Sequence, residues 1–386
     1  MALPLKYNVR NVLVRWRATL ATILGVALVV SVYVLVLSLA VGLEKSSQNT
    51  GDPRNMLIVR KGSTAESASQ ITREQYRQLV YLPQIARDTN GEPLISADVI
   101  VLLCLPRQDG SEANVLLRGV SPMGRELRPQ VALAAGRWFV RGQREVVVSR
   151  RMAARFANFK PGEQFVTGGK TLTVVGWLDG GNSAFDSEVW MDADEARAIF
   201  DRENYSSALA RVASPAEGLS LSNRVDTDKR LSLRAMGEAD YYSKQTMTAM
   251  PIKILGNFLA TIMSVGAVFA AMNTMYASVG SRTREIGTLR VLGFRRRTVL
   301  LSFLIEGALL SLIGGILGCL LALPMHGYTT ATIGLETFSE TVFQFRITPG
   351  LVAQGLIFSV IVGVVGSLLP AMRAARLPVI AALKTV

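Results

Sequence analysis

The residues with the clearest potential for chemistry form one short basic stretch, Ser281 to Arg297, which lies between two long apolar segments. The stretch, SRTREIGTLRVLGFRRR, contains six arginines and a single acid, Glu285. Arginine makes bidentate charge-assisted hydrogen bonds to carboxylates and phosphates, and a glutamate accepts such bonds. These residue types indicate recognition of a charged partner surface rather than catalysis.

The same stretch has the pattern of a short amphipathic helix, because three apolar residues recur at i, i+3 and i+6 and a glycine follows as a C-cap. These residues are Ile286, Leu289, Leu292 and Gly293. Arg282 and Glu285 are three apart and can form an ion pair worth a few tenths of a kcal/mol. A solvated basic loop would explain the arginines alone. A short helix presented to a partner explains both the arginines and the apolar stripe.

Other residues that could do chemistry lack the partners they would need. His326 is the single histidine, so a histidine metal site or a Ser/His/Asp triad would rest on it alone. The string TGGK, residues 167–170, resembles a phosphate loop but lacks the required spacing. We therefore expect no catalytic, cofactor or metal site in this chain.

Four long apolar segments indicate a membrane protein, because about 20 apolar residues suffice to span the hydrocarbon core. The first has no charged residue and the third has one, Glu306. The segments run from Ala18 to Leu43, from Ile254 to Gly280, from Val299 to Met325 and from Leu351 to Met372. Glu306 is expected to pair with an arginine or to face a dimer interface, since a carboxylate facing lipid is costly. Asn273 is expected to form an interhelical hydrogen bond.

The distribution of positive charge sets the orientation. The insert between the first two segments, Leu43 to Met250, has 27 basic and 25 acidic residues, so most of the net charge of +13 lies on the other side of the membrane. The positive-inside rule places that side in the cytoplasm. The basic composition is therefore a topology signal, and a nucleic-acid-binding protein is excluded. Both termini are expected inside and the insert outside.

The insert has the alternating strand and helix patterns of an α/β module. Residues 55–62 and the segments around the TGGK turn read as strands, and a helix is expected from Thr72, its N-cap, to Leu82. The part from Asp226 to Met250 is expected to form a helical stalk that leads into the second span.

The expected fold is a membrane α-helical protein with four transmembrane helices and an inserted α+β extracytoplasmic domain. The predicted segments are a cytoplasmic amphipathic N-terminal helix (1–17), TM1 (18–43), the extracytoplasmic α/β core domain with its stalk (44–250), TM2 (251–280), a cytoplasmic coupling helix (281–297), TM3 (298–325), a short outer loop (326–349), TM4 (350–372) and a cytoplasmic tail (373–386).

Several of these stretches resemble one known family. EIGTLRVLG with its basic run, the opening RNVLVRWRATLATILGVAL and the closing LLPAMRAARLPVIAALK are similar to motifs of the MacB/FtsX-type ABC transporter permeases. In the insert, REVVVSRRMAARF and TLTVVGWLD resemble the family's MacB-like periplasmic core domain. The resemblances touch most of the chain in the expected order. One departure is that the MacB protein carries a fused ATPase, which these residues lack.

The resemblance implies a mechanism called mechanotransmission, in which ATP-driven closure of cytoplasmic ATPases is relayed to the periplasmic domains. It implies a bacterial inner-membrane location, a partner ABC ATPase subunit that uses ATP and magnesium, and a second permease protomer. A periplasmic adaptor and an outer-membrane channel are further partners of this family type. Export is the first function that it implies. The alternatives are an FtsX-like regulator of a cell-wall hydrolase and a LolC/LolE-like lipoprotein-releasing permease.

The resemblance also implies that the basic stretch couples the chain to the ATPase. Glu285, Gly287 and Arg290 are expected to be central, because Gly287 would permit close approach and the other two can make charge-assisted hydrogen bonds. The expected coupling residues are Arg282, Glu285, Ile286, Gly287, Leu289, Arg290, Leu292 and Gly293.

Overall fold

A computed structural model describes residues 16–245, 249–333 and 338–377 of the chain, so the predicted N-terminal helix (1–17) and tail (373–386) lie largely outside the described residues. The chain divides into two compact units. The helical unit comprises Met1–Val41, Pro251–Tyr328 and Phe345–Val386, and the α/β unit comprises Gly42–Met250 and Thr329–Gln344. The chain therefore crosses between the two units four times.

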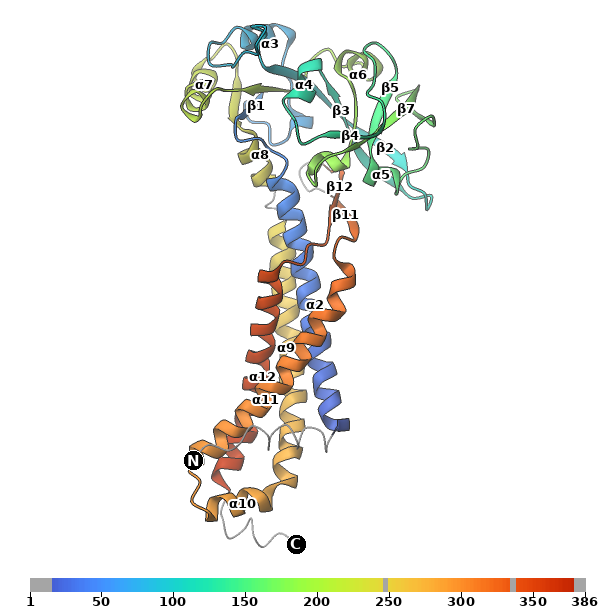
Figure 1. Ribbon diagram of the computed structural model, residues 1–386. Coiled ribbons are helices and arrows are strands. Elements are labelled where there is room, and N and C mark those ends of the chain that lie inside the picture. The colour runs from blue at the N-terminus through green and yellow to red at the C-terminus, as the bar shows by residue number, and fades with distance from the viewer. Residues whose placement is uncertain (1–15, 246–248, 334–337, 378–386) are drawn as a thin grey trace. The chain divides into compact units, whose positions relative to one another are not determined.

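The helical unit is built on four long helices, α2 (Trp16–Gln48), α9 (Ala249–Ser281), α11 (Arg296–Ala322) and α12 (Pro349–Arg376), which are drawn in Figure 1. Each is long and apolar enough to cross a membrane. A short helix, α10 (Thr283–Val291), joins α9 to α11, and a 3-10 turn, η4 (Leu323–Met325), follows α11. The prediction of four spans is confirmed.

Helices α11 and α12 approach each other closely because glycines on one helix face serines on the other. A Cβ atom at Gly307 would collide with the side chain of Ser367, and one at Gly363 would collide with Ser311. Small residues allow backbones to approach in this way and gain van der Waals contact without a hydrophobic driving force. The Gly- and Ser-rich sequences of these spans therefore encode their packing.

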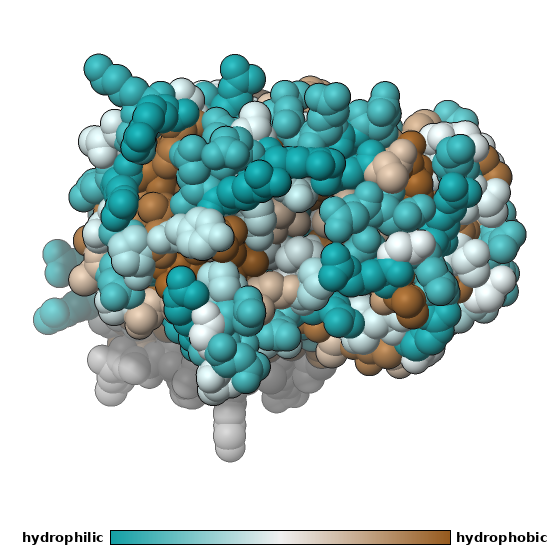
Figure 2. All heavy atoms as spheres, turned by 90° about the horizontal axis from the view of Figure 1, so that it is seen from above, coloured by the Kyte–Doolittle hydropathy of each residue, from teal (hydrophilic) through white to brown (hydrophobic). Residues whose placement is uncertain are grey.

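The α/β unit contains a ten-stranded mixed sheet with the order β10-β1-β9-β2-β3-β8-β5-β7-β4, in which β6 pairs with β7. Its strands are β1 (Asn55–Arg60), β2 (Ile95–Pro106), β3 (Glu112–Val120), β4 (Ala132–Gly136), β5 (Glu145–Ser149), β6 (Gln164–Thr167), β7 (Lys170–Asp179), β8 (Glu188–Asp192), β9 (Ser207–Arg211) and β10 (Leu233–Gly237). Its helices are α3 (Arg73–Val80), α4 (Pro122–Glu126), α5 (Arg150–Ala153), α6 (Ala193–Ile199), α7 (Pro215–Thr227) and α8 (Glu238–Gln245), with 3-10 turns η1 (Glu66–Ala68) and η2 (Ala184–Ser187). The face shown in Figure 2 is mostly hydrophilic, with apolar side chains in separate patches, as expected of a surface in water.

Strand β2 divides this sheet into two lobes. Its first residues, Ile95–Asp98, pair with β9, whereas Val99–Pro106 pair with β3. Lobe one comprises β10, β1 and β9 with α3 and α7, and residues such as Ile58, Leu79 and Leu221 form its core. Lobe two comprises β3 and the strands beyond it, around a separate core that includes Val146 and Phe156. The two cores share one continuous strand, which changes partner between Asp98 and Val99. A third buried apolar cluster, which includes Leu57 of β1 and Trp190 of β8, packs the two lobes together.

Local predictions in this unit are confirmed where the turn or cap chemistry is specific. Thr72 is the N-cap of α3 and forms a capping box with Gln75. The TGGK string is the turn between β6 and β7, with φ of +55° at Gly168 and +69° at Gly169. Both values are readily adopted by glycine, which is why this sequence makes a hairpin.

Two predictions about the edges of this unit are wrong. The stalk expected from Asp226 to Met250 is not helical throughout, because Leu233–Gly237 form β10, which pairs with β1 at the edge of the sheet. The segment 326–349 is not a simple outer loop, because it contains a hairpin of β11 (Thr329–Ile333) and β12 (Glu340–Gln344) that belongs to the α/β unit. All three strands are five residues long, and the context in which they pack rather than their local pattern decides such short strands.

Candidate docking site for a partner

The predicted basic stretch folds as the helix α10 between two tight turns. Residue Arg282 stands at its N-terminus and Leu292 at its C-terminus. Gly293 has φ of +92°, its N–H donates to the carbonyl of Arg290, and the N–H of Phe294 donates to the carbonyl of Leu289. This pair of bonds is a Schellman motif, so the predicted C-cap is confirmed.

The first turn of α10 is anchored to α11 by a buried ion pair. Arg282 Nη1 lies 2.8 Å from Glu306 Oε2, and the two side chains are 8% and 6% exposed. The guanidinium also lies over the ring of Phe303, with Cζ 5.8 Å from the ring centroid. This is within the limit of about 6 Å for a cation–π contact. Glu285 is 3.9 Å from the Arg282 guanidinium, a weaker and more exposed contact. The arginine partner predicted for Glu306 is therefore Arg282.

The two sides of α10 have different environments. Ile286 and Gly287 are buried, and Ile286 packs in a cluster with Met275, Val299 and other apolar side chains of α9, α11 and α12. Leu289 and Arg290 are half-buried, and Arg290 Nη1 donates to the carbonyl of Phe294. Four of the predicted coupling residues thus lie on the inner side of the helix. Gly287 was expected to allow a partner to approach closely, but it is covered by other residues of this chain.

The outer side of α10 is both charged and apolar. Its exposed residues follow a helical spacing and are Arg284, Glu285, Thr288, Val291 and Leu292. Val291 is 62% exposed and Leu292 is 69% exposed, whereas Glu285 has 54% of its side chain exposed. The three exposed arginines 295–297 continue this surface at the start of α11. We call these five exposed residues the α10 face. Arg284, Thr288 and Val291 were not among the predicted coupling residues, because a stripe of leucines and isoleucine does not show which side of the helix is covered.

Asn273 makes no interhelical hydrogen bond within the described residues of this single chain, so the predicted bond stays a prediction. Its side chain is exposed on α9, and the described residues of this chain provide it with no hydrogen-bond partner. An amide on the surface of a membrane helix is costly unless another helix supplies a partner. His326 has a structural contact, because its Nδ1 accepts from the N–H of Ile347 at 3.1 Å.

A second charged cluster, which sequence reasoning missed, lies at the junction of the two lobes. Arg118 on β3 pairs with Glu66, Asp98 and Glu188, at 3.0, 3.2 and 2.8 Å. All four side chains are buried. The signal that could have revealed it is an arginine inside an apolar strand, LLRGV, since a buried arginine requires carboxylate partners.

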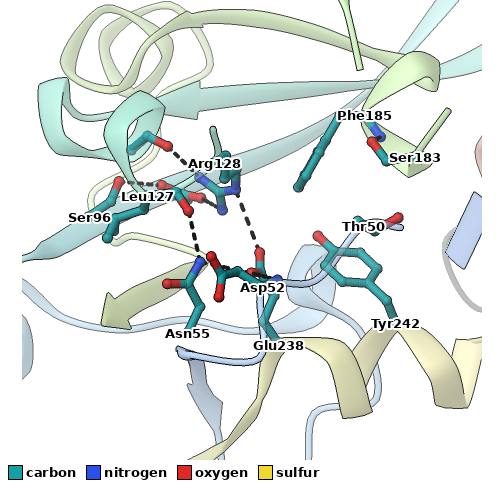
Figure 3. A network of polar contacts seen from close by, with 12 residues as sticks. Thr50, Asp52, Asn55, Ser96, Leu127, Arg128, Ser183, Phe185, Glu238 and Tyr242 are labelled. Atoms are coloured by element: carbon teal, nitrogen blue, oxygen red, sulfur yellow. Dashed lines mark hydrogen bonds and ion pairs between the residues drawn. The ribbon is translucent and has the colours of Figure 1, made fainter. Parts of the chain in front are cut away.

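Arg128 extends this cluster toward α8 (Figure 3). Its Nη2 lies 2.5 Å from Asp98 Oδ2, and its Nε lies 3.8 Å from Glu238 Oε1. Within the described residues, neither Arg128 Nε nor Glu238 Oε1 has a hydrogen bond. The other oxygen of Glu238 accepts from the Asp52 N–H at 3.0 Å and from the Asn55 side chain at 2.9 Å. Glu238 thus ties the start of α8 to the segment that enters β1.

The pKa values of Glu238 and Asp98 are shifted in opposite directions. Burial raises the pKa of Glu238, and the attraction of Arg128 offsets that effect only in part. For Asp98 burial acts in the same sense, but Arg128 and Arg118 together outweigh it and lower the pKa below the ordinary aspartate value. The cluster therefore holds Asp98 as the firmly ionised centre between two arginines. It contains no nucleophile–base pair, and its arrangement is that of a structural ion network.

Comparison with known proteins accounts for both units. A family model described as MacB-like periplasmic core domain matches residues 19–227, just over half of the chain. A second, described as FtsX-like permease C-terminal, matches residues 257–379. The first match covers most of α2 and most of the α/β unit, and the second covers α10, α11 and α12 with most of α9.

Two relatives have similar sequences. The uncharacterized ABC transporter permease YknZ of Bacillus subtilis (strain 168) is 30% identical over 261 residues, which are 64% of this chain and 63% of YknZ. The macrolide export ATP-binding/permease protein MacB of Bordetella avium (strain 197N) is 29% identical over 326 residues, 74% of this chain and 47% of that protein. The chain thus spans less than two thirds of the length of either relative.

Among solved structures, the periplasmic region of MacB from Actinobacillus actinomycetemcomitans is similar at 14% identity and a TM-score of 0.39, over 52% of this chain and 94% of that one. The two family models match successive parts of the chain, first residues 19–227 and then residues 257–379, and together they cover most of both units. The chain therefore belongs to the MacB/FtsX-type ABC transporter permeases.

Proposed function

We propose that this chain is a permease subunit that relays the ATP-driven motion of an ATPase to its own α/β unit, for export of a substrate from the periplasm or the inner membrane. The observation that carries this proposal is the α10 face, a rigidly mounted surface between two membrane helices. Family membership supports the role of a permease, and the geometry supports the role of a relay.

The α10 face has the composition of a docking surface. Two large apolar side chains, Val291 and Leu292, are exposed beside Arg284 and Glu285. Exposed apolar side chains rimmed by charges are typical of protein–protein contacts, in which the charges set register and partner choice. An ATPase surface with an apolar pocket and opposite charges at its rim fits this face. The proposed ATPase is not contained in these 386 residues, which lack a phosphate-binding loop.

The mounting of α10 allows a displacement to be transmitted. The Arg282–Glu306 pair and the packing of Ile286 bind α10 to α11 and its neighbours, so α10 cannot move independently of the helices. Helix α9 has 33 residues and would be about 50 Å long at 1.5 Å per residue. Its proline, Pro251, lies in the first turn, where it does not kink a helix, so α9 can act as a rod.

The proposed orientation follows from the charges. The residues with the large excess of arginine, which include the start of α11, would lie in the cytoplasm of a bacterial inner membrane, and the nearly neutral α/β unit would lie outside. An odd number of spans separates α10 from the α/β unit along the chain, so the two lie on opposite sides. We further propose that two permease protomers, identical or paralogous, form the working unit.

The test is co-purification of the ATPase with Glu285→Lys in the full-length chain. The charge reversal is expected to abolish capture and transport, because it places a positive charge opposite the positive charge of the ATPase surface. Breaking one partner of a buried interfacial charge pair costs roughly 2–5 kcal/mol. Membrane insertion should be unchanged because Glu285 is largely exposed. Glu74→Lys, on the exposed surface of α3, is the matched control. Undiminished capture and transport by the Glu285→Lys chain would refute the proposed docking role.

A further inference from the structure

The hairpin of β11 and β12 is part of the α/β unit, although the helices on either side of it, α11 and α12, belong to the helical unit. The α/β unit is therefore attached to the spans not only through α2 and α9 but also through this hairpin. Because the hairpin was expected to be a plain loop, its contacts with the unit decide whether it can carry force.

Glu340, the first residue of β12, holds the hairpin in place. Its side chain is 2% exposed and lies between two arginines of lobe two. Oε2 accepts from Arg107 Nη2 at 2.7 Å and from Arg107 Nε at 3.0 Å. Oε1 lies 2.6 Å from Arg155 Nη2 and accepts from Arg155 Nε at 2.7 Å. A buried carboxylate in which each oxygen is held by charge-assisted bonds from a different arginine is strongly held.

The rest of β12 is seated in the core of lobe two. Val342 is fully buried and belongs to the same apolar cluster as Val146 and Phe156. Its backbone N–H donates to Ser187 Oγ of η2 at 2.7 Å. Just before β12, the carbonyl of Phe338 accepts from Asn114 Nδ2 at 3.0 Å. The hairpin is therefore fixed to lobe two by charge, by apolar burial and by hydrogen bonds.

The other chain crossing, through α8, has its polar anchor in lobe one. Glu238 at the start of α8 holds Asp52 and Asn55, and Asn55 is the first residue of β1. Tyr242 of α8 also packs on Phe185 of lobe two. The polar anchor of α8 is therefore in lobe one, whereas that of the hairpin is in lobe two. A cavity of about 50 Å³ lies between them, lined by Tyr241 of α8, by Glu66 and by Ser339 and Thr341 of the hairpin segment. Beside this cavity, a buried apolar cluster joins Leu57 of β1 to Trp190 of β8, so the two lobes also pack against each other directly.

We propose that the hairpin is a second lever of the relay, with Glu340 as the positioning residue that couples it to lobe two. Movement of α9 reaches lobe one through α8, and movement of α11 and α12 reaches lobe two through β12. A difference between the two movements turns the lobes about the point where β2 changes partner, at Asp98 and Val99. This inference rests on the proposed function and adds the route by which the second lobe is driven.

The attachment is tested in the full-length chain by the labelling of a cysteine at a buried hairpin position, Val342→Cys, in a Cys104→Ser background. Glu340→Gln keeps the shape but removes the charge, and losing one partner of a buried pair should raise the labelling rate roughly 100-fold. Glu112→Gln, an exposed glutamate at the start of β3, is the control and should leave the rate unchanged. An equal rate in the Glu340→Gln and control chains would overturn the role of Glu340.

The lever itself is tested with the ATPase bound. The readout is the ATP-dependent change in labelling of Ser67→Cys, whose side chain lines the cavity between the lobes. Glu340→Gln should remove this change, and a cross-link made by Asn114→Cys with Phe338→Cys should restore it. A full ATP response in the Glu340→Gln chain, or no restoration by the cross-link, overturns the lever alone. Absence of any ATP response in the otherwise unmodified chain overturns the proposed relay, so the two failures are distinguishable.

Discussion

The guanidinium of Arg282 and the carboxylate of Glu306 meet at 2.8 Å, buried between the end of α9 and the first turns of α11. The pair joins two spans through the base of α10, so it determines whether a force applied to the α10 face reaches α9. A buried pair of this kind adds little net stability compared with an apolar replacement, but breaking it leaves a buried charge.

We therefore expect Glu306→Ala to destabilise the helical unit by about 3–5 kcal/mol. The double variant Arg282→Met, Glu306→Leu should recover most of that loss, because it leaves no buried charge behind. Thermal unfolding of the detergent-solubilised chain measures both effects. Equal stability of the single variant and the unmodified protein would mean that the pair is solvated rather than buried.

The apolar part of the α10 face should contribute to affinity for the ATPase without contributing to folding. Leu292→Asp is expected to weaken ATPase binding by about 1.5–3 kcal/mol, which is the value of burying a leucine side chain. Its thermal stability should be unchanged, since Leu292 is 69% exposed. Titration of the ATPase against the reconstituted permease provides the measurement, with Leu219→Asp on the exposed surface of α7 as the control. Identical affinities for the two variants would place the contact elsewhere.

The junction of the lobes should show opposite responses to neutralising two neighbouring acids. The lowered pKa of Asp98 stabilises the fold above the ordinary aspartate pKa of 3.8, and this contribution is lost as the pH falls through the lowered value. The raised pKa of Glu238 has the opposite effect on stability. The protonated carboxyl stabilises the fold at low pH, and this contribution is lost as the pH rises above 4.5 through the raised pKa. The ionised form of Glu238 is therefore less favourable in the folded chain than in the unfolded chain.

Accordingly, Asp98→Asn should cost about 3–5 kcal/mol at pH 7, because it leaves two buried arginines short of a carboxylate. Glu238→Gln should be slightly stabilising at pH 7 and neutral at acidic pH. Tryptophan fluorescence during thermal unfolding at pH 5 and pH 8 reports both, since Trp190 is fully buried in the α/β unit. A destabilising Glu238→Gln at pH 8 would contradict the sign assigned to this group.

Asn273 should stabilise a dimer of protomers, because its amide has an exposed position on α9 and needs a partner within the membrane. Asn273→Leu is expected to weaken dimerisation by about 0.6 kcal/mol, the average for such bonds in membrane helices, and by at most about 1.7 kcal/mol. The fraction of dimer in detergent, compared with Val265→Leu on the same helix, tests this. A variant that dimerises as well as its control would show that the amide faces lipid or solvent.

The orientation predicts that a cysteine at Arg284 is protected from an impermeant reagent added to intact cells, whereas one at the exposed residue Tyr81 reacts. Labelling of Arg284→Cys from outside would reverse the assigned topology. Permeabilised cells provide the control, because there both positions should react.

Much of this molecule was predictable from its sequence because its strongest signals are local. A run of about 20 apolar residues must cross a bilayer whatever else the chain does, and arginine distribution orients it. The N-cap at Thr72, the turn at Gly168 and Gly169 and the C-cap at Gly293 depend on a few adjacent residues, and all three were predicted. The short helix α10 was also predicted from its spacing.

Contacts between distant residues were decided only by the tertiary structure. The short strand β10 forms because β1, more than 150 residues away, offers it a partner, which no local pattern records. The strand β12 pairs with its neighbour β11, but its place in lobe two depends on distant residues such as Ser187. The same holds for Glu340, an ordinary loop glutamate until Arg107 and Arg155 enclose it. Likewise the stripe Ile286, Leu289 and Leu292 predicted a helix but not which side is covered, because burial depends on the neighbouring spans rather than on the helix itself.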